Sequence, residues 1–328
     1  MDRASASGAE GRRFDSFRGH VSNNPTSKRT YLLRRVAVFG VAIFLLVAFL
    51  KLLAGMLSPD STSVDSAPTP IPVATPAFDC AANTPLPQSF IDTWVLEFGA
   101  VDFNATVIDL VENCVYSMGD SVSVFPTAST GKLVIATGVM ELVAAGTLDY
   151  ASVESDLTSM ITQSDNSAAD RLFDVIGGND AVISIIERYG LTATTTGGAW
   201  GTILTNSVDQ ANLLNQVIGT QTSTMPQAQR DTLRALLTKV NPDQAWGAGN
   251  VTIPGWTIAV KNGWYLSVPG DRPPEGLWRI NTLGYVWDQT SKPRWIFTGY
   301  SNTWATEERG ISAWNSVSTQ LSNSLGIR

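Results

Sequence analysis

The sequence predicts an α+β fold in which a five-stranded antiparallel sheet packs against helices, with an all-helical part between its strands in the chain. Three observations support this fold. The chain has five strand-like runs, two early and three late: 105–111, 114–118, 256–261, 278–287 and 294–300. Helical patterns fill the chain between the two groups, and an amphipathic helix follows the last strand. Hairpins at both ends of a helical middle imply that all five strands join one sheet.

The N-terminal part of the chain predicts a membrane anchor. Residues 36–57 are apolar throughout except for Lys51, and these 22 residues suffice for one bilayer crossing, which takes about 20. Residues 1–35 carry eight Lys or Arg against three Asp or Glu, so the positive-inside rule predicts a basic cytoplasmic tail and an exported remainder. A cleaved signal peptide is the alternative, but a 35-residue leader is long for one and lacks a convincing small-x-small cleavage site. We therefore predict an uncleaved, single-pass signal-anchor.

A tether and one extracytoplasmic domain are predicted after this span. Residues 58–78 contain five prolines among Ser, Thr and Val, which is typical of a semi-rigid, extended spacer. Residues 79–328 supply the folded domain. The chain beyond Lys51 holds 13 Lys or Arg against 26 Asp or Glu, and so acidic a domain is a poor binder of nucleic acids.

The first elements of this domain are a helix and a hairpin. Phe90, Trp94 and Phe98 lie on one stripe of a helix predicted at 88–98, and Glu112-Asn113 suits the turn between the two early strands. Cys80 and Cys114 are the two cysteines of the chain. An even pair in an oxidising compartment predicts a disulfide, and two buried free thiols are the alternative.

The remaining elements follow from periodicity and from end signals such as glycine. The predicted helices are a run from Ser129 to near Gly146, then 154–162, 167–175, 180–189, 208–218, 227–240 and, after the late strands, 307–325.

The polar loop before the second helix carries a candidate nucleophile. Ser129 is predicted at or near a helix N-terminus, where free backbone N–H groups favour negative charge. Lys132 follows three residues later, on the same helical face. A Ser-x-x-Lys pair alone is weak evidence, because a capping serine and a solvated lysine give the same pattern. The single histidine, His20, lies on the other side of the predicted membrane, so a Ser-His-Asp triad is excluded and a Ser–Lys pair is favoured.

Two further motifs occur along the chain. Ser164-Asp165-Asn166 falls between two predicted helices, and Lys261-Asn262-Gly263-Trp264 ends the first late strand. Each alone is an ordinary capping or turn sequence. The three motifs in this order resemble those of the penicillin-recognising serine enzymes, and within them most closely the class A β-lactamases and related peptidases. The resemblance covers about residues 80–328 and implies a β-lactamase/transpeptidase-like fold.

The resemblance also implies roles for individual residues. Ser129 would attack the substrate carbonyl, Lys132 would accept its proton, and Ser164 would relay a proton to the leaving nitrogen while Lys261 holds it. The charge of Lys261 and burial would both lower the pKa of Lys132.

Substrate contacts are implied for a second group of residues. The substrate-binding candidates are Asn166, Asn262, Gly263 and Trp264, with the backbone N–H groups of Ser129 and Trp264 as the oxyanion hole. Arg279, on the neighbouring strand, is interpreted as a surface arginine rather than as a carboxylate anchor. No metal or cofactor is implied.

The sequence departs from the family pattern at several points. Class A β-lactamases use a glutamate between the second and third motifs to activate the deacylating water, but 188–208 holds no Asp or Glu. Asn262 replaces the usual Thr or Ser, and Trp264 is bulky where small residues are usual. The step from Ser129 to Ser164 is also short. We therefore expect a long-lived acyl-enzyme.

Three hypotheses remain. The first is a serine hydrolase that acts on cell-wall D-Ala peptides or β-lactams. The second is a weak or inactive relative that serves as a cell-wall binding or sensor module. The third is a structural partner of a membrane complex that uses the acidic surface. A Ser129–Lys132 hydrogen bond would favour the first, and a cleft filled by Trp264 or Trp200 would favour the second. The sequence does not predict an oligomeric state.

Overall fold

The computed structural model describes residues 78–219, 223–271 and 275–327. All described residues belong to one compact unit, 75–328. The predicted cytoplasmic tail, the predicted span and all of the predicted tether except Phe78 lie outside the described residues. Within the described ranges, no helix has the length and apolar character needed to cross a bilayer.

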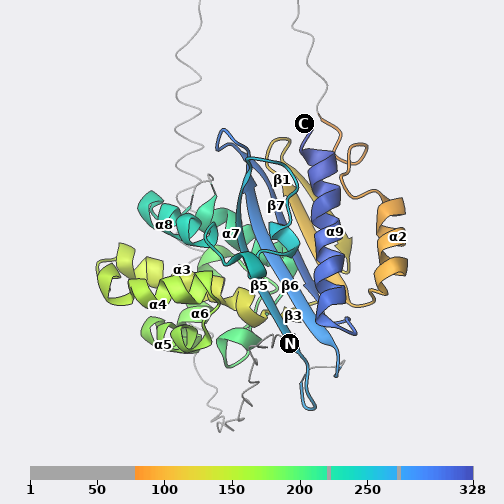
Figure 1. Ribbon diagram of the computed structural model, residues 1–328. Helices are drawn as coiled ribbons and strands as arrows, with labels where there is room; N and C mark the ends of the chain where they lie inside the picture. Colours follow the sequence, from red (N-terminus) through yellow and green to blue (C-terminus); the bar gives the residue numbers. More distant parts are fainter. Residues whose placement is uncertain (1–77, 220–222, 272–274, 328) are drawn as a thin grey trace, which may run out of the picture. The chain divides into compact units, whose positions relative to one another are not determined.

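A five-stranded antiparallel sheet forms the centre of the described unit, as predicted (Figure 1). The strand order, which was not predicted, is β2-β1-β7-β6-β5. Its strands are β1 (Phe103–Asp109), β2 (Cys114–Gly119), β5 (Thr257–Leu266), β6 (Trp278–Trp287) and β7 (Pro293–Ser301). β5 continues five residues past its predicted end. It stays paired with β6 up to Leu266, so the Lys261-Asn262-Gly263-Trp264 motif lies inside a strand and not at its end. Gly263, a turn glycine in the alternative interpretation of this motif, is instead a point of close packing.

Eight α-helices are present in the described residues. They are α2 (Gln88–Phe98), α3 (Lys132–Ala144), α4 (Tyr150–Thr162), α5 (Asn166–Ile176), α6 (Gly178–Tyr189), α7 (Ser207–Ile218), α8 (Gln227–Leu237) and α9 (Glu307–Leu325). All the predicted helices are present, with ends shifted by up to four residues. α4 begins four residues early because the Asp149 side chain caps it at Ala151 N. A two-stranded pairing of β3 (Phe125–Pro126) with β4 (Leu204–Thr205) was not predicted.

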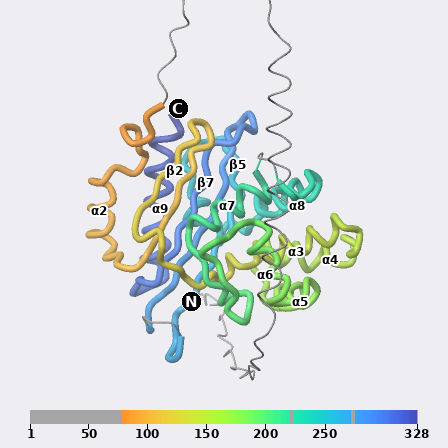
Figure 2. Tube along the Cα trace, turned by 180° about the vertical axis from the view of Figure 1, so that it is seen from behind, coloured from red at the N-terminus to blue at the C-terminus, as the bar shows by residue number. Residues whose placement is uncertain are grey.

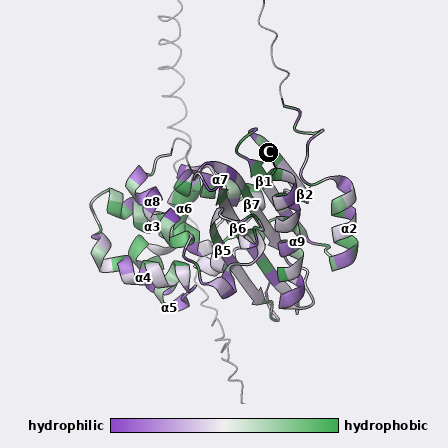
Figure 3. Cartoon of the chain, turned by 45° about the horizontal axis from the view of Figure 1, so that its top comes forward, coloured by the Kyte–Doolittle hydropathy of each residue, from purple (hydrophilic) through white to green (hydrophobic). Residues whose placement is uncertain are grey.

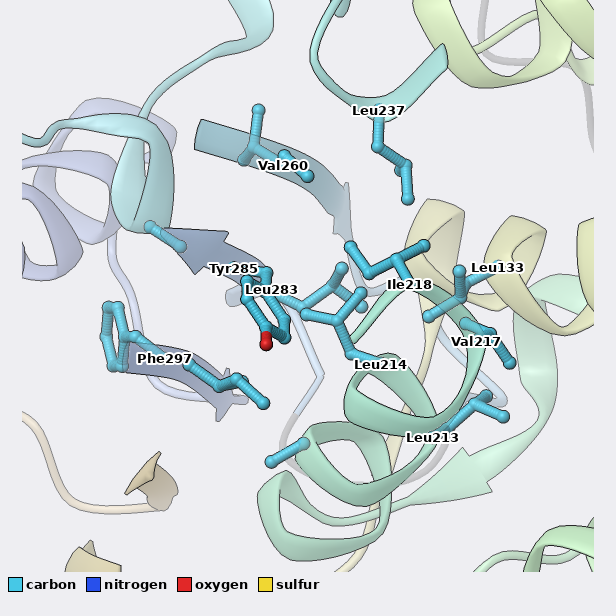
Figure 4. Packing of buried hydrophobic residues seen from close by; sticks show 14 of the residues in the cluster. Leu133, Leu213, Leu214, Val217, Ile218, Leu237, Val260, Leu283, Tyr285 and Phe297 are labelled. Atoms are coloured by element: carbon cyan, nitrogen blue, oxygen red, sulfur yellow. The ribbon is translucent and has the colours of Figure 1, made fainter. Parts of the chain in front are cut away.

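Helices cover both faces of the sheet. α9 lies on one face with α2 beside it, whereas α7 lies on the opposite face (Figures 1 and 2). Leu214 of α7 lies toward Leu283 and Tyr285 of β6 in the core between helix and sheet (Figure 4). On the α9 face, the indole of Trp314 donates to the backbone oxygen of Ile280 at 2.8 Å. The sheet is thus buried on both sides and has little freedom to move.

The helical part is built around α3. Hydrophilic and hydrophobic sectors alternate along the helices (Figure 3), but the first nine residues of α3, Lys132 to Met140, are all buried. A helix buried all round belongs to the core rather than to the surface. Lys132 is therefore enclosed by protein as soon as α3 begins.

The Cys80–Cys114 disulfide forms, as predicted, with a Cα–Cα distance of 5.7 Å. It joins the segment before α2 to the first residue of β2 and closes a loop over a separation of 34 residues. Because such a cross-link restricts the unfolded chain, replacing both cysteines by serine should lower the free energy of unfolding by about 2–4 kcal/mol. Denaturant titration of both proteins measures this loss. An unchanged unfolding midpoint would contradict it, and adding reductant to the serine variant should have no effect.

Candidate active site

Ser129 lies in a short 3₁₀ turn, η1 (Ala128–Gly131), that leads directly into α3. The turn is supported from the sheet. The Asn281 amide of β6 donates to the backbone oxygens of Pro126 and Thr127, at 2.8 and 3.2 Å. The predicted position of Ser129 at the start of a helix is therefore confirmed, with one 3₁₀ turn between the serine and the α-helix.

Backbone strain accumulates at this site. Four described residues other than glycine have a positive φ, and two of them are Ala128 (48°), next to Ser129, and Ser164 (58°). The other two, Asn113 and Ser291, lie in the turns between strands. Such conformations cost about 1–3 kcal/mol each and persist where surrounding contacts hold them, which is frequent in functional sites.

The amine of Lys132 is the hub of the site. Its Nζ lies 3.1 Å from Ser129 Oγ, 3.0 Å from Ser164 Oγ, 2.6 Å from the Ser164 backbone oxygen and 2.8 Å from Asn166 Oδ1. The side chain is fully buried. Burial lowers the pKa of Lys132 to about 7, although the nearby carboxylates of Asp165 and Asp170 act in the opposite direction. Close to neutral pH, a substantial share of this amine is therefore uncharged.

Lys261 reaches the same serine from the sheet. Its fully buried Nζ donates to Ser164 Oγ at 3.0 Å, so this hydroxyl lies between two amines at equal distances. Burial lowers the pKa of Lys261 well below its usual value, and the charge of Lys132 lowers it further. The sequence interpretation attributed the lowered pKa of Lys132 to both burial and the charge of Lys261. In the structure, burial is the main cause of the lowered pKa.

The structure brings Asn166 and Gly263 to the site, whereas the ring of Trp264 packs against another tryptophan. Asn166 begins α5 and accepts a hydrogen bond from Lys132. Gly263 touches η1 through its backbone, because a Cβ atom there would lie 2.7 Å from the backbone nitrogens of both Ser129 and Thr130. Trp264 is half-buried and packs edge-on against Trp246, with ring centroids 5.7 Å apart.

Asn262 does not face the site as predicted. It is fully buried, and its Nδ2 donates to the backbone oxygens of Gln244 and Trp246, at 2.8 Å each. These carbonyls lie where one short 3₁₀ turn (Pro242–Gln244) ends and the next (Gly247–Gly249) begins, outside the strands, and they take both amide hydrogens. Both amide hydrogens are therefore bonded within the protein, in place of the substrate contact that was predicted for this amide.

Arg279 also differs from its interpretation as a surface arginine. It is 1% exposed, and its Nη1 donates to Asn302 Oδ1 at 2.7 Å. The guanidinium lies 5.3 Å from the ring centroid of Tyr265. Arg279 is thus part of the packing at the end of the sheet.

Two residues near Lys132 were not predicted as parts of the site. Asp170 was not considered, and Trp200 was considered only as a possible obstruction of the cleft. The indole ring of Trp200 lies 4.7 Å from Lys132 Nζ, and its Nε1 donates to Asp170 Oδ1 at 2.8 Å. The signal for Asp170 was available, since it follows Asn166 by four residues on one helix and so shares its face. No such rule connects Trp200 to either motif.

The arrangement fits nucleophilic acyl transfer by a Ser–Lys pair. A partly neutral amine within hydrogen-bond distance of a hydroxyl can accept its proton, and the second serine can pass a proton onward. In the described ranges, no group of three or more His, Cys, Asp or Glu is placed to hold a metal ion.

Solved structures of class A β-lactamases share this fold. An ancestral (GNCA) class A β-lactamase matches with a TM-score of 0.59 and 17% identity, over 72% of this chain and 98% of that one. A β-lactamase from Xanthomonas campestris pv. campestris str. ATCC 33913 matches with a TM-score of 0.60 and 18% identity, over 72% and 97%. One from Chitinophaga pinensis DSM 2588 gives 0.61 and 15%, over 72% and 98%. At these identities, the likeness establishes the fold.

The family is established from the sequence itself. Comparison with curated proteins found no match. The model of the beta-lactamase enzyme family matches residues 150–325, a range that includes Ser164 and Lys261 and ends at the last residue of α9. Because this match spans more than half of the 328 residues, the chain belongs to the beta-lactamase enzyme family.

Proposed function

We propose that this protein is a serine hydrolase that forms an acyl-enzyme at Ser129 with β-lactams or with D-Ala peptides of the cell wall. The observation that carries the proposal is the Ser129–Lys132 pair, with 3.1 Å between hydroxyl and amine and a lysine pKa of about 7. A nucleophile needs a neighbouring base that is unprotonated near neutral pH, and this amine meets that requirement.

The proposed reaction uses the four catalytic candidates. Lys132 takes the proton of Ser129, and Ser129 Oγ bonds to the carbonyl carbon of the substrate. The carbon–nitrogen bond then breaks while Ser164 gives its proton to the leaving nitrogen, and Lys132 returns a proton to Ser164. Lys261 holds the Ser164 hydroxyl in place at 3.0 Å.

Release of the acyl group is the slow step in this proposal. Hydrolysis needs a base to activate water, and the segment 188–208 holds no carboxylate. A stable acyl-enzyme is the behaviour of a penicillin-binding peptidase rather than of a resistance enzyme.

We place the domain outside the cell membrane, held by the predicted single span. The apolar run at 36–57, the basic residues before it and the Cys80–Cys114 disulfide of an oxidising compartment support this location.

Intact-protein mass after incubation with a fluorescent penicillin tests the function. The full chain should gain one penicillin per molecule, and Ser129→Ala should gain none. Ser316→Ala, a helix serine whose hydroxyl bonds to the Ala313 backbone oxygen, is the matched control and should be labelled normally. Rapid loss of penicillin without an adduct would contradict slow deacylation, and the absence of both adduct and loss would contradict the acyl-enzyme.

A second candidate is a binding or sensor module that keeps the pocket without turnover. The contact of the Trp200 ring with Lys132 favours it, because this side chain is only 7% exposed and covers the amine. Absence of an adduct, together with reversible binding of penicillin, would support this candidate.

A further inference from the structure

The indole of Trp200 contacts both the amine of Lys132 and the carboxylate of Asp170. Its ring centroid lies 4.7 Å from Lys132 Nζ, and its Nε1–H donates to Asp170 Oδ1 at 2.8 Å. The side chain is almost fully buried. The Trp200 ring therefore fills the space next to Lys132, the base of the proposed reaction, and it also donates a hydrogen bond to one carboxylate oxygen of Asp170.

The segment that carries Trp200 is firmly attached. Its backbone oxygen accepts from Thr127 Oγ1 at 3.0 Å, in the loop before Ser129. Gly131 fits so closely that a Cβ atom would lie 2.4 Å from this same oxygen. Further along the chain, β4 pairs with β3, just before Ser129. These contacts hold the backbone at Trp200 against the η1 turn that carries Ser129, and so fix the position of the indole.

Asp170 is the carboxylate available for hydrolysis at this end of the site. Asp165 and Asp170 are the two acids whose charges act on Lys132. Asp165 Oδ1 caps α5 by accepting from Ala168 N at 2.7 Å, so its carboxylate is committed to the helix. Asp170 is exposed, and its Oδ1 accepts from the Trp200 side chain. A mutation of Trp200 therefore removes this hydrogen bond from the carboxylate.

We propose that Trp200 sets the lifetime of the acyl-enzyme by excluding water from the space between Asp170 and the Ser129 ester. The inference rests on the proposed acyl-enzyme and adds a positioning residue to it. With the indole in place, no water can contact Asp170 and the ester carbon together. With a small residue at 200, a water molecule gives its proton to Asp170 and its oxygen attacks the ester carbon. The bond from that carbon to Ser129 Oγ then breaks, Oγ takes the proton, and the acyl group leaves as a carboxylic acid.

The test is the half-life of the penicillin adduct on the full chain after excess penicillin is removed. Trp200→Ala should shorten it about tenfold or more, because a positioned base contributes at least that much to water attack. Adding Asp170→Asn to Trp200→Ala should return the half-life to within about threefold of the wild type. Adding Asp174→Asn, at an exposed acid one turn further along α5, to Trp200→Ala is the matched control and should leave the half-life as short as in Trp200→Ala alone.

The outcomes separate this inference from the proposed function. A wild-type chain that forms no adduct refutes the acyl-enzyme itself. An adduct whose half-life is the same or longer in Trp200→Ala refutes the role of Trp200, and an equally short half-life in the double variant with Asp170→Asn refutes the role of Asp170. A purely structural role would slow acylation and lower the melting temperature without shortening the half-life. If Trp200→Ala does not fold, Trp200→Leu keeps apolar volume and should also shorten the half-life.

Discussion

Replacing Lys132 by methionine is expected to slow acylation of Ser129 by about 10³-fold, the middle of the range for losing a general base. Methionine keeps the apolar stem and removes the amine that lies 3.1 Å from the serine hydroxyl. The wild-type rate should also depend on pH. Since burial lowers the pKa of Lys132 to about 7, the amine is protonated below that pH and cannot accept a proton. The acylation rate should rise about tenfold per pH unit up to pH 7 and level off above it.

Stopped-flow fluorescence with a fluorescent penicillin between pH 5.5 and 9 measures both effects. Lys239→Met, which replaces an exposed lysine of the same domain, is the matched control and should keep the wild-type rate and profile. A wild-type profile that is flat across pH 7 would show that Lys132 is not the group that takes the proton.

The sheet and helices could be predicted because their signals are local. Strand-like runs bounded by turn residues gave the five strands, and apolar stripes gave the eight helices. The candidate site was predictable for another reason. Ser129, Ser164 and Lys261 belong to short motifs in a fixed order, and the fold brings the Lys261 amine within hydrogen-bond distance of the Ser164 hydroxyl, 97 positions away in sequence.

The features that were missed depend on contacts between distant segments. The amide of Asn262 turns to the carbonyls of Gln244 and Trp246 because that loop folds over β5, and no local pattern shows this. Trp200 was considered in the sequence only as a side chain that could fill the cleft. Its relation to Lys132 and Asp170 arises because the β3–β4 pairing brings this loop to the turn of Ser129. Side-chain partners across the fold follow from packing, which a single sequence does not specify.

Gly263→Ala is expected to slow acylation about 10²-fold, because displacing a reacting group by less than 1 Å can have an effect of that size. The added Cβ would lie 2.7 Å from the backbone nitrogen of Ser129 and 2.8 Å from the backbone oxygen of Thr127. These are main-chain atoms, so no side chain can rotate away to relieve the contact. Either β5 or η1 must move, and β5 is held by its full pairing with β6. The turn that carries Ser129 should therefore shift.

The variant should also lose stability. Inserting a methyl group into a well-packed region costs about 1–3 kcal/mol, which denaturant titration would measure alongside the acylation rate. Gly249→Ala is the matched control, because its Cβ would meet Val260 Cγ2 at an ordinary 3.4 Å and leave Ser129 in place. If Gly263→Ala acylates within threefold of the wild-type rate, then the close packing of β5 on η1 does not position the nucleophile. If the acylation rates of Gly263→Ala and Gly249→Ala fall equally, the loss reflects general damage to the fold rather than the contact at Ser129.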